Sequence, residues 1–510
     1  MKSVGKKTMG LSAFLVTVVT LFVAGYLYVK KKFQYWEERG VPYVKPEFPY
    51  GNLKGIGTTK HTTDIFPKIY KQFKGKVLFG GMYYFTEPVA IAVDLELIKN
   101  IFIRDYQYFA DRGLYMNEKD DPLSGHIFAL TGQRWKNLRN KFSPTFSSGK
   151  IKMMQETINA VAKELQNYLE PIAQRSEVVE IKDIMSRFTI DVIGSCAFGV
   201  ECNSLKNPNA EFKRIGKRVF DYSGLEFLRA YFLTMFPNLG RALRMKFNKE
   251  DVSEFFMRIL RETTEYREKN NIKRNDFLSL LMQIMKTGKL EGDDTELGKL
   301  TFNELAAQTF IFFVAGYETS SSAMTFALYE LAQHQDIQDR ARTEVQKILE
   351  KYNGEFTYDA CMEMNYIDQV INESMRKHPI GDNLIRICIK DYNVPGTKHV
   401  IEKGTTVMVP VYGIHHDPQI YPDPEKFDPD RFTEENIKNR HPCAWLPFGE
   451  GPRNCIGMRF GMMQTRVGLG HVLTKYRVKT SPKTQIPYVA DPHINVLSSK
   501  GGMWLKLEKI

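Results

Sequence analysis

The sequence predicts a mainly α-helical protein with a minor β portion, preceded by a single N-terminal transmembrane helix. Apolar residues recur at helical spacing through most of residues 146–349, whereas short alternating runs, typical of strands, gather near residues 76–92, residues 384–411 and the C-terminus. An uncharged apolar run of membrane-spanning length lies near the N-terminus. With 510 residues, of which 43% are hydrophobic, the remainder of the chain can bury a large core.

Residues 1–30 are predicted to form a membrane anchor. No charged residue occurs between Lys7 and Lys30, and residues 9–29 are long enough to cross the roughly 30 Å hydrocarbon core as a helix. A cleaved signal peptide is the alternative, but its apolar core is shorter, roughly 7–15 residues, and it ends in a small-residue cleavage site. Because lysines flank the run on both sides, the positive-inside rule does not decide the orientation.

The rest of the chain divides into a connector and one large domain. Pro42, Pro46 and Pro49 lie within residues 31–50 and favour a stiff, non-helical stretch around them. Residues 51–510 contain no repeat, low-complexity tract or Gly/Ser linker, so we expect a single domain there.

Charge and cysteine content restrict the class of protein. The net charge of +12 fits a membrane surface better than nucleic acid, because lysines flank the apolar run while basic residues of the body are interspersed with acidic ones. The six cysteines form neither the dense framework of a small secreted protein nor a zinc, iron–sulfur or c-type haem motif. No Gly-x-Gly-x-x-Gly or Walker loop is present, so electrons for a redox reaction would have to come from another protein.

A long helix is predicted for the centre of the domain. Thr301 and Glu304 form a capping-box pattern, and the helical pattern that follows runs to about Gln333 without a proline. Its middle reads Ala-Gly-Tyr-Glu-Thr-Ser over residues 315–320. Such a patch is compatible with plain helix packing, but polar groups in so apolar a helix are costly without a role or a partner.

One cysteine stands in a distinctive loop. Residues 448–457 read Phe-Gly-Glu-Gly-Pro-Arg-Asn-Cys-Ile-Gly, and the glycines permit a tight turn. A helical pattern begins near Ile456, so Cys455 lies at a helix N-terminus, where the helix dipole and amide donors favour a thiolate. A thiolate can bind haem iron. The other five cysteines are interpreted as small buried residues.

This loop resembles the cysteine loop of the cytochrome P-450 superfamily at every defining position, and the resemblance covers nearly the whole chain. The chain is most similar to the insect microsomal branch that handles plant toxins and insecticides. The resemblance implies the cytochrome P-450 fold with a long central helix, and it implies haem b (iron protoporphyrin IX) as cofactor. Cys455 would be the ligand of the iron, with Phe448, Gly449 and Arg453 in the loop that binds the haem.

The resemblance also assigns roles in the central helix. Ala315 and Gly316 would pass over the open face of the haem, where Gly316 leaves room for dioxygen. Thr319 and Glu318 would be the catalytic pair that supports proton delivery.

Other residues would bind the haem propionates or hold the cysteine loop. Guanidinium groups suit carboxylates, and the propionate candidates are Trp135, Arg139, Arg386 and Arg453. Arg112 is a further candidate, although the favoured interpretation of that arginine is an ordinary surface residue. Glu373, Arg376 and Arg431 resemble the buried Glu-Arg-Arg network that holds the cysteine loop in place.

The implied function is that of a monooxygenase of the endoplasmic reticulum membrane, with its body in the cytosol. It would insert one oxygen atom of O2 into a hydrophobic small molecule, either a xenobiotic or an endogenous lipophile. Electrons would come from NADPH through NADPH-cytochrome P-450 reductase, with cytochrome b5 as an additional candidate partner; no nucleic-acid partner is expected. Two alternatives keep the haem: a thiolate enzyme that rearranges a peroxide without a reductase, and a non-catalytic haem-binding protein. The intact Glu318 and Thr319 argue against the first, and the second would need no such pair.

Overall fold

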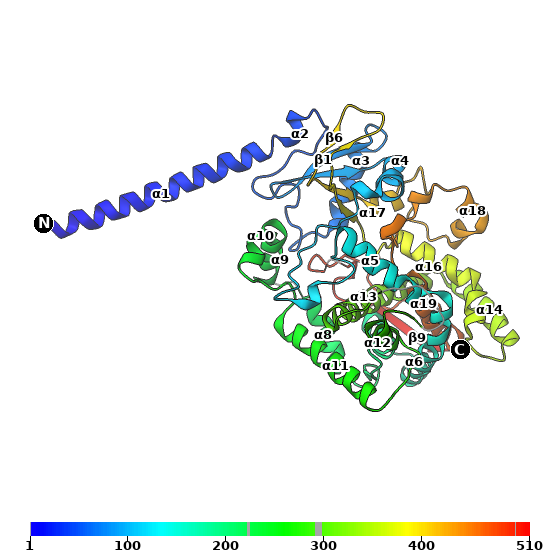
Figure 1. Ribbon diagram of the computed structural model, residues 1–510. Coiled ribbons are helices and arrows are strands. Elements are labelled where there is room, and N and C mark those ends of the chain that lie inside the picture. The colour runs from blue at the N-terminus through cyan, green and yellow to red at the C-terminus, as the bar shows by residue number, and fades with distance from the viewer. Residues whose placement is uncertain (1, 222–224, 291–297, 495) are drawn as a thin grey trace.

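The computed structural model describes residues 2–221, 225–290, 298–494 and 496–510 of the chain. Helices make up most of this part, and the strands are short, so the predicted mainly α-helical architecture with a minor β portion is confirmed (Figure 1). The helices are α1 (Lys2–Lys32), α2 (Tyr35–Glu38), α3 (Phe66–Phe73), α4 (Leu95–Lys99), α5 (Gly132–Phe142), α6 (Ser148–Gln174), α7 (Ile181–Ile193), α8 (Glu211–Val219), α9 (Leu225–Met235), α10 (Pro237–Ala242), α11 (Glu250–Lys269), α12 (Phe277–Thr287), α13 (Phe302–Gln333), α14 (Gln335–Lys351), α15 (Tyr358–Met362), α16 (Asn365–Lys377), α17 (Val411–His415), α18 (Glu434–Lys438) and α19 (Met458–Lys475).

The strands are β1 (Phe79–Tyr84), β2 (Glu87–Ala92), β3 (Val178–Glu180), β4 (Leu384–Ile387), β5 (Tyr392–Asn393), β6 (Val400–Ile401), β7 (Thr406–Val409), β8 (Tyr476–Lys479) and β9 (Trp504–Lys509). They lie near the three predicted regions, except for β3, which interrupts the predicted helical stretch of residues 146–349 because it pairs with the C-terminal strand β9. The largest sheet has the order β1-β2-β7-β4, in which only β2 and β7 run parallel. It therefore ties the N-terminal part of the domain to the segment that follows α16.

The central helix is α13, which contains 32 residues and spans about 48 Å at 1.5 Å per residue. It starts with the predicted capping box: the Glu304 N–H donates to Thr301 Oγ1 at 3.2 Å, and the Thr301 N–H donates to Glu304 Oε2 at 2.9 Å. Helices α7, α12, α16 and α19 contact α13, which runs through the middle of the body (Figure 1). Most of its side chains are buried, because it lies in the core and not on the surface.

Helix α1 projects away from the body (Figure 1). Within the described residues, the stretch Phe14–Glu38 is the one helical segment long and apolar enough to cross a membrane, and its apolar window is 0% buried against the rest of the protein. The connector that follows packs onto the body: Trp36 is buried and donates from Nε1 to the Met82 carbonyl at 3.0 Å. Arg39 binds both carboxylate oxygens of Glu402. The projecting helix is thus fixed to the domain at its C-terminal end.

Removal of residues 1–30 should release most of the protein from membranes, because the exposed apolar helix is lost while Trp36 and Arg39 keep their contacts with the body. The measurement is the fraction that remains in the pellet after alkaline carbonate washing. The full-length chain serves as the control, and a circular dichroism spectrum of the released protein checks that the domain is folded. If the truncated protein stayed integral to the bilayer, a second inserted element would be required.

Candidate functional site

Cys455 lies in a tight loop between a short turn, η9 (Gly451–Arg453), and helix α19. The Cys455 N–H donates to the Phe448 carbonyl at 2.9 Å, which closes the loop. Gly449 and Gly451 have φ angles of +67° and +73°, in the left-handed region that favours glycine. A Cβ at Gly451 would come within 1.8 Å of the Phe102 carbonyl oxygen, so only glycine lets the loop lie against that backbone.

The Cys455 side chain is accessible, although the protein around it shields it from much of the solvent. It is exposed, whereas the other five cysteines are buried. Nevertheless, burial raises the pKa of the Cys455 thiol, and the Gly457 N–H and the charges of Arg139 and Arg112 lower it. The Gly457 amide stabilises the thiolate, as expected for a cysteine at the start of a helix. Desolvation, which favours the neutral thiol, has the larger effect on the pKa.

Four arginines from separate segments converge near Cys455: Arg112, Arg139, Arg386 and Arg453. Burial, together with the charges of neighbouring arginines, lowers the pKa of Arg112 and Arg453 to about 9 and that of Arg386 to about 10. In the described part of the chain, only one acidic side chain forms an ion pair with these arginines. It is Asp111, whose Oδ1 lies 3.4 Å from Arg453. Desolvated cations in such excess call for an anionic ligand, and the two carboxylates of a haem fit this requirement.

The same arginines hold the cysteine loop. Arg139 donates to the Asn454 carbonyl at 3.0 Å and to Asn454 Oδ1 at 2.9 Å. The Arg453 guanidinium stacks on the Trp135 ring, with its carbon 3.8 Å from the ring centre. Arg112 donates to the Arg453 carbonyl at 2.9 Å, so the interpretation of Arg112 as a surface residue is wrong. The sequence could not reveal this, because an arginine in a loop has the same local pattern whichever way it points.

The middle of α13 presents an open face. In this fully described helix, Ala315 and Thr319 are exposed, although the residues next to them are buried or partly buried. The two lie four residues apart, which puts them on one side of the helix, and Thr319 Oγ1 donates to the Ala315 carbonyl at 2.6 Å. From α19, Gln464 donates to the Gly316 carbonyl at 3.1 Å, so the helix that follows Cys455 contacts α13 beside its open face.

Gly316 itself faces another helix. A Cβ at this position would lie 2.8 Å from Ile193 Cδ1 in α7, so the glycine permits α13 and α7 to approach closely. A role in making room for dioxygen stays a prediction.

Glu318 is held by a residue that the sequence analysis missed. Lys182, near the start of α7, lies 2.8 Å from Glu318 Oε1 and also donates to Ser321 Oγ and Ser322 Oγ at 2.7 and 2.8 Å. The two side chains of the pair are 17% and 12% exposed, so solvent still reaches them. No hydrogen bond joins Glu318 to Thr319 among the described residues. No sequence signal could have identified Lys182, because 136 residues separate it from its partner.

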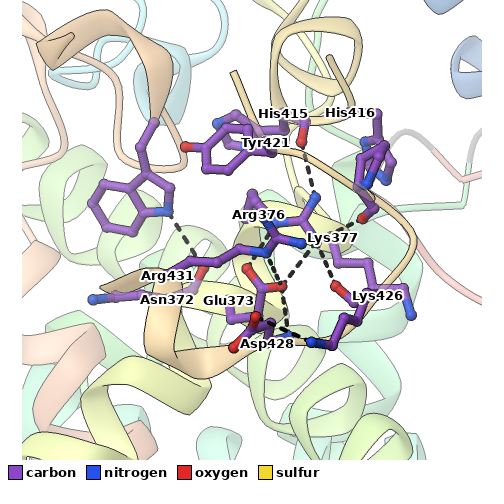
Figure 2. Close-up of polar contacts among 12 residues, drawn as sticks. Asn372, Glu373, Arg376, Lys377, His415, His416, Tyr421, Lys426, Asp428 and Arg431 are labelled. Atoms are coloured by element: carbon purple, nitrogen blue, oxygen red, sulfur yellow. Dashed lines mark hydrogen bonds and ion pairs between the residues drawn. The ribbon is translucent and has the colours of Figure 1, made fainter. Parts of the chain in front are cut away.

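The predicted Glu-Arg-Arg network is present and fully buried at its centre (Figure 2). Arg376 donates to both carboxylate oxygens of Glu373 at 2.7 and 2.9 Å, and Arg431 Nε lies 3.4 Å from the same group. Arg376 also donates to the His415 carbonyl at 2.9 Å. His415 Nε2 in turn accepts the Leu446 N–H at 2.9 Å, two residues before the cysteine loop begins. The network therefore holds the segment that leads into Cys455.

The comparisons with known proteins agree with this geometry. The family model described as Cytochrome P450 matches residues 42–505. Probable cytochrome P450 6a23 of Drosophila melanogaster is 46% identical over 502 residues, which cover 98% of this chain and 99% of the relative. Cytochrome P450 6a2 of the same species is 45% identical over 503 residues, covering 98% of this chain and 99% of the relative. Cytochrome P450 6A1 of Musca domestica is 44% identical over 507 residues, with the same shares covered.

These matches span the cysteine loop, the four arginines and the open face of α13 within one continuous alignment. They also agree with the resemblance to insect members that the sequence suggested. The chain is a member of the cytochrome P450 family.

Proposed function

We propose that the protein is a monooxygenase that oxidises hydrophobic small molecules at the endoplasmic reticulum membrane. Its substrates would be xenobiotics, such as plant toxins or insecticides, or endogenous lipophiles. Residues 1–30 would be the anchor, residues 31–50 the connector and residues 51–510 the catalytic domain, with the body in the cytosol. NADPH-cytochrome P-450 reductase would supply electrons, and cytochrome b5 is a further candidate donor. The observation that carries the proposal is that Cys455, the one exposed cysteine, lies beside the arginine cluster, while the helix that follows it contacts α13 next to the open face at Ala315 and Thr319.

The residues present fit haem b. Cys455 would hold the iron through its sulfur, and the four arginines would neutralise the propionates, which explains why so many desolvated cations share one place. When bound, the haem supplies the activation of dioxygen and the insertion of one oxygen atom into the substrate. The protein's part is to bind and orient the reactants and to deliver protons.

Proton delivery would use both sides of α13. Thr319 presents its hydroxyl at the open face, where the group can hold a proton at Oγ1. Glu318 and Lys182 lie where solvent has partial access, so they would pass protons from outside toward Thr319. Because no direct hydrogen bond links Glu318 with Thr319 in the described residues, a water molecule would have to bridge them.

Replacing Thr319 with alanine tests the proposal. Product formed per NADPH consumed should fall, by at most about 10²-fold, since that is the lower end for proton-transfer groups and water can substitute in part. Peroxide should rise in the same reaction, while the carbon monoxide spectrum stays unchanged because Cys455 is untouched. A variant that kept the wild-type ratio on several good substrates would show that Thr319 is only a packing residue.

The chain offers a matched control in the same helix. Thr309 also donates its hydroxyl to the carbonyl four residues earlier, at 2.9 Å, but its side chain is fully buried away from the open face. Thr309→Ala should leave the ratio of product to NADPH unchanged. A parallel assay with a peroxide substrate and no reductase separates the monooxygenase from the two alternatives: turnover there without NADPH-dependent product would favour the peroxide isomerase, and turnover in neither assay would favour a non-catalytic haem protein.

A further inference from the structure

We propose that His126 is an additional residue of the haem site, where its neutral imidazole donates an Nε2–H hydrogen bond to one of the haem carboxylates bound by the arginine cluster. The proposal rests on the haem site described above. It adds a contact that the sequence motifs do not indicate, because His126 lies in an irregular segment before α5.

The backbone on both sides of His126 is fixed by the central helix. Gln308 of α13 is fully buried, and its Oε1 accepts the Ile127 N–H at 2.7 Å. Its Nε2 donates to the Gly125 carbonyl at 3.1 Å. Both neighbours of His126 are therefore attached to one side chain of α13, which leaves the histidine little freedom to change position.

The same segment binds the arginine cluster. Arg453 donates to the Leu130 carbonyl at 2.8 Å and to the Ile127 carbonyl at 3.4 Å. Arg112 donates to the Phe128 carbonyl at 3.3 Å. His126 is thus part of the short stretch of backbone against which two of the guanidinium groups rest.

The hydrogen bonds of the imidazole determine its tautomer. The Ala129 N–H is shared between the His126 carbonyl at 2.9 Å and Nδ1 at 3.2 Å, and the neutral tautomer in which Nδ1 accepts carries its proton on Nε2. Burial, together with the charge of Arg112, lowers the pKa of His126 to about 4, so the ring is neutral at neutral pH. Nε2 has no hydrogen-bond partner among the described residues, and the side chain is only partly buried. Like Cys455, it is desolvated but not fully covered, and it lies close enough to Arg112 for that charge to lower its pKa.

Charge balance favours a neutral donor at this place. Four guanidinium groups already exceed the combined charge of Asp111 and two propionates. A further cation would increase the repulsion that lowers the pKa of the arginines. A neutral N–H adds a directional bond to a carboxylate without adding charge.

The test is the rate of haem loss from the full-length holoprotein in detergent to an excess of apomyoglobin. His126→Phe keeps a ring of similar size but has no donor, and it should release haem about tenfold to hundredfold faster, the range for losing a hydrogen bond to a charged group. His126→Gln retains an amide donor, so its rate of haem loss should be closer to that of the wild type. His493→Phe changes an exposed histidine whose contact is Asp491, and it should have no effect.

A second measurement excludes a merely structural role. Loss of the donor leaves more negative charge on the propionate, so the reduction potential of the haem should fall in His126→Phe and recover in His126→Gln. If His126→Phe fails to fold, the comparison of His126→Ala with His126→Gln decides the question in the same way. If His126→Phe and His126→Ala lost haem at the wild-type rate and kept the wild-type reduction potential, the proposal would be overturned. Haem loss does not depend on product formation, so an enzyme that retains haem without oxidising any substrate would refute the proposed function while leaving this test intact.

Discussion

Replacing Cys455 with alanine should abolish the red-shifted Soret band of the reduced carbon monoxide complex, and monooxygenase activity with it. That band requires a thiolate on the iron, and Cys455 is the one cysteine whose side chain is exposed. The arginine cluster would still attract haem carboxylates, so some haem can remain bound without the band. The measurement is the difference spectrum of reduced protein with and without carbon monoxide, normalised to haem content.

Cys443→Ala is the matched control for this variant. Cys443 lies twelve residues earlier, and it is fully buried among apolar neighbours. Burial raises the pKa of its thiol to about 12, so it is not a competing thiolate. This variant should keep the band. If Cys455→Ala kept the band, or if only Cys443→Ala lost it, Cys455 would not be the ligand of the iron.

Glu373→Gln should prevent stable holoprotein from accumulating. The Glu373 and Arg376 side chains are both 0% exposed, and removal of the carboxylate charge leaves Arg376 and Arg431 without an anion. Breaking a buried pair by removing one partner typically lowers the free energy of unfolding by about 3–5 kcal/mol. The segment leading to Cys455 would lose its support, because Arg376 also holds His415 and, through it, Leu446.

The same chemical change on the surface provides the control. Glu363 pairs with Lys351 at 2.6 Å, but the side chains are 41% and 62% exposed, so Glu363→Gln should change stability by less than about 1 kcal/mol. Urea unfolding and haem content per milligram of purified protein measure both effects. Equal stability of the two variants would mean that the buried network does not support the cysteine loop.

Local patterns in the sequence predict some parts of this protein well. The capping box at Thr301 predicted the first residue of α13, and the cysteine loop predicted the tight turn at Gly449 and Gly451. Both depend on residues within a few positions of one another. The Glu373–Arg376 pair is of the same kind, since the two lie one helical turn apart.

Contacts between distant segments could not be predicted in that way. Lys182 contacts Glu318, which lies 136 residues later in the chain. Gln308 hydrogen-bonds to the backbone on both sides of His126, more than 180 residues earlier. The direction of a side chain was also beyond the sequence: Gly316 faces α7, and Arg112 points inward, because tertiary packing and not local spacing sets those directions.

The contacts of the cysteine loop also set an order of events during biosynthesis. Arg139 binds Asn454 across 315 residues, and Arg112 binds Arg453 across 341. Contacts between such distant positions form late, because the intervening chain must first be ordered. By the time residue 455 leaves the ribosome, the N-terminal helix has long been available for insertion. We therefore expect the haem pocket to close late, well after the N-terminal helix has left the ribosome.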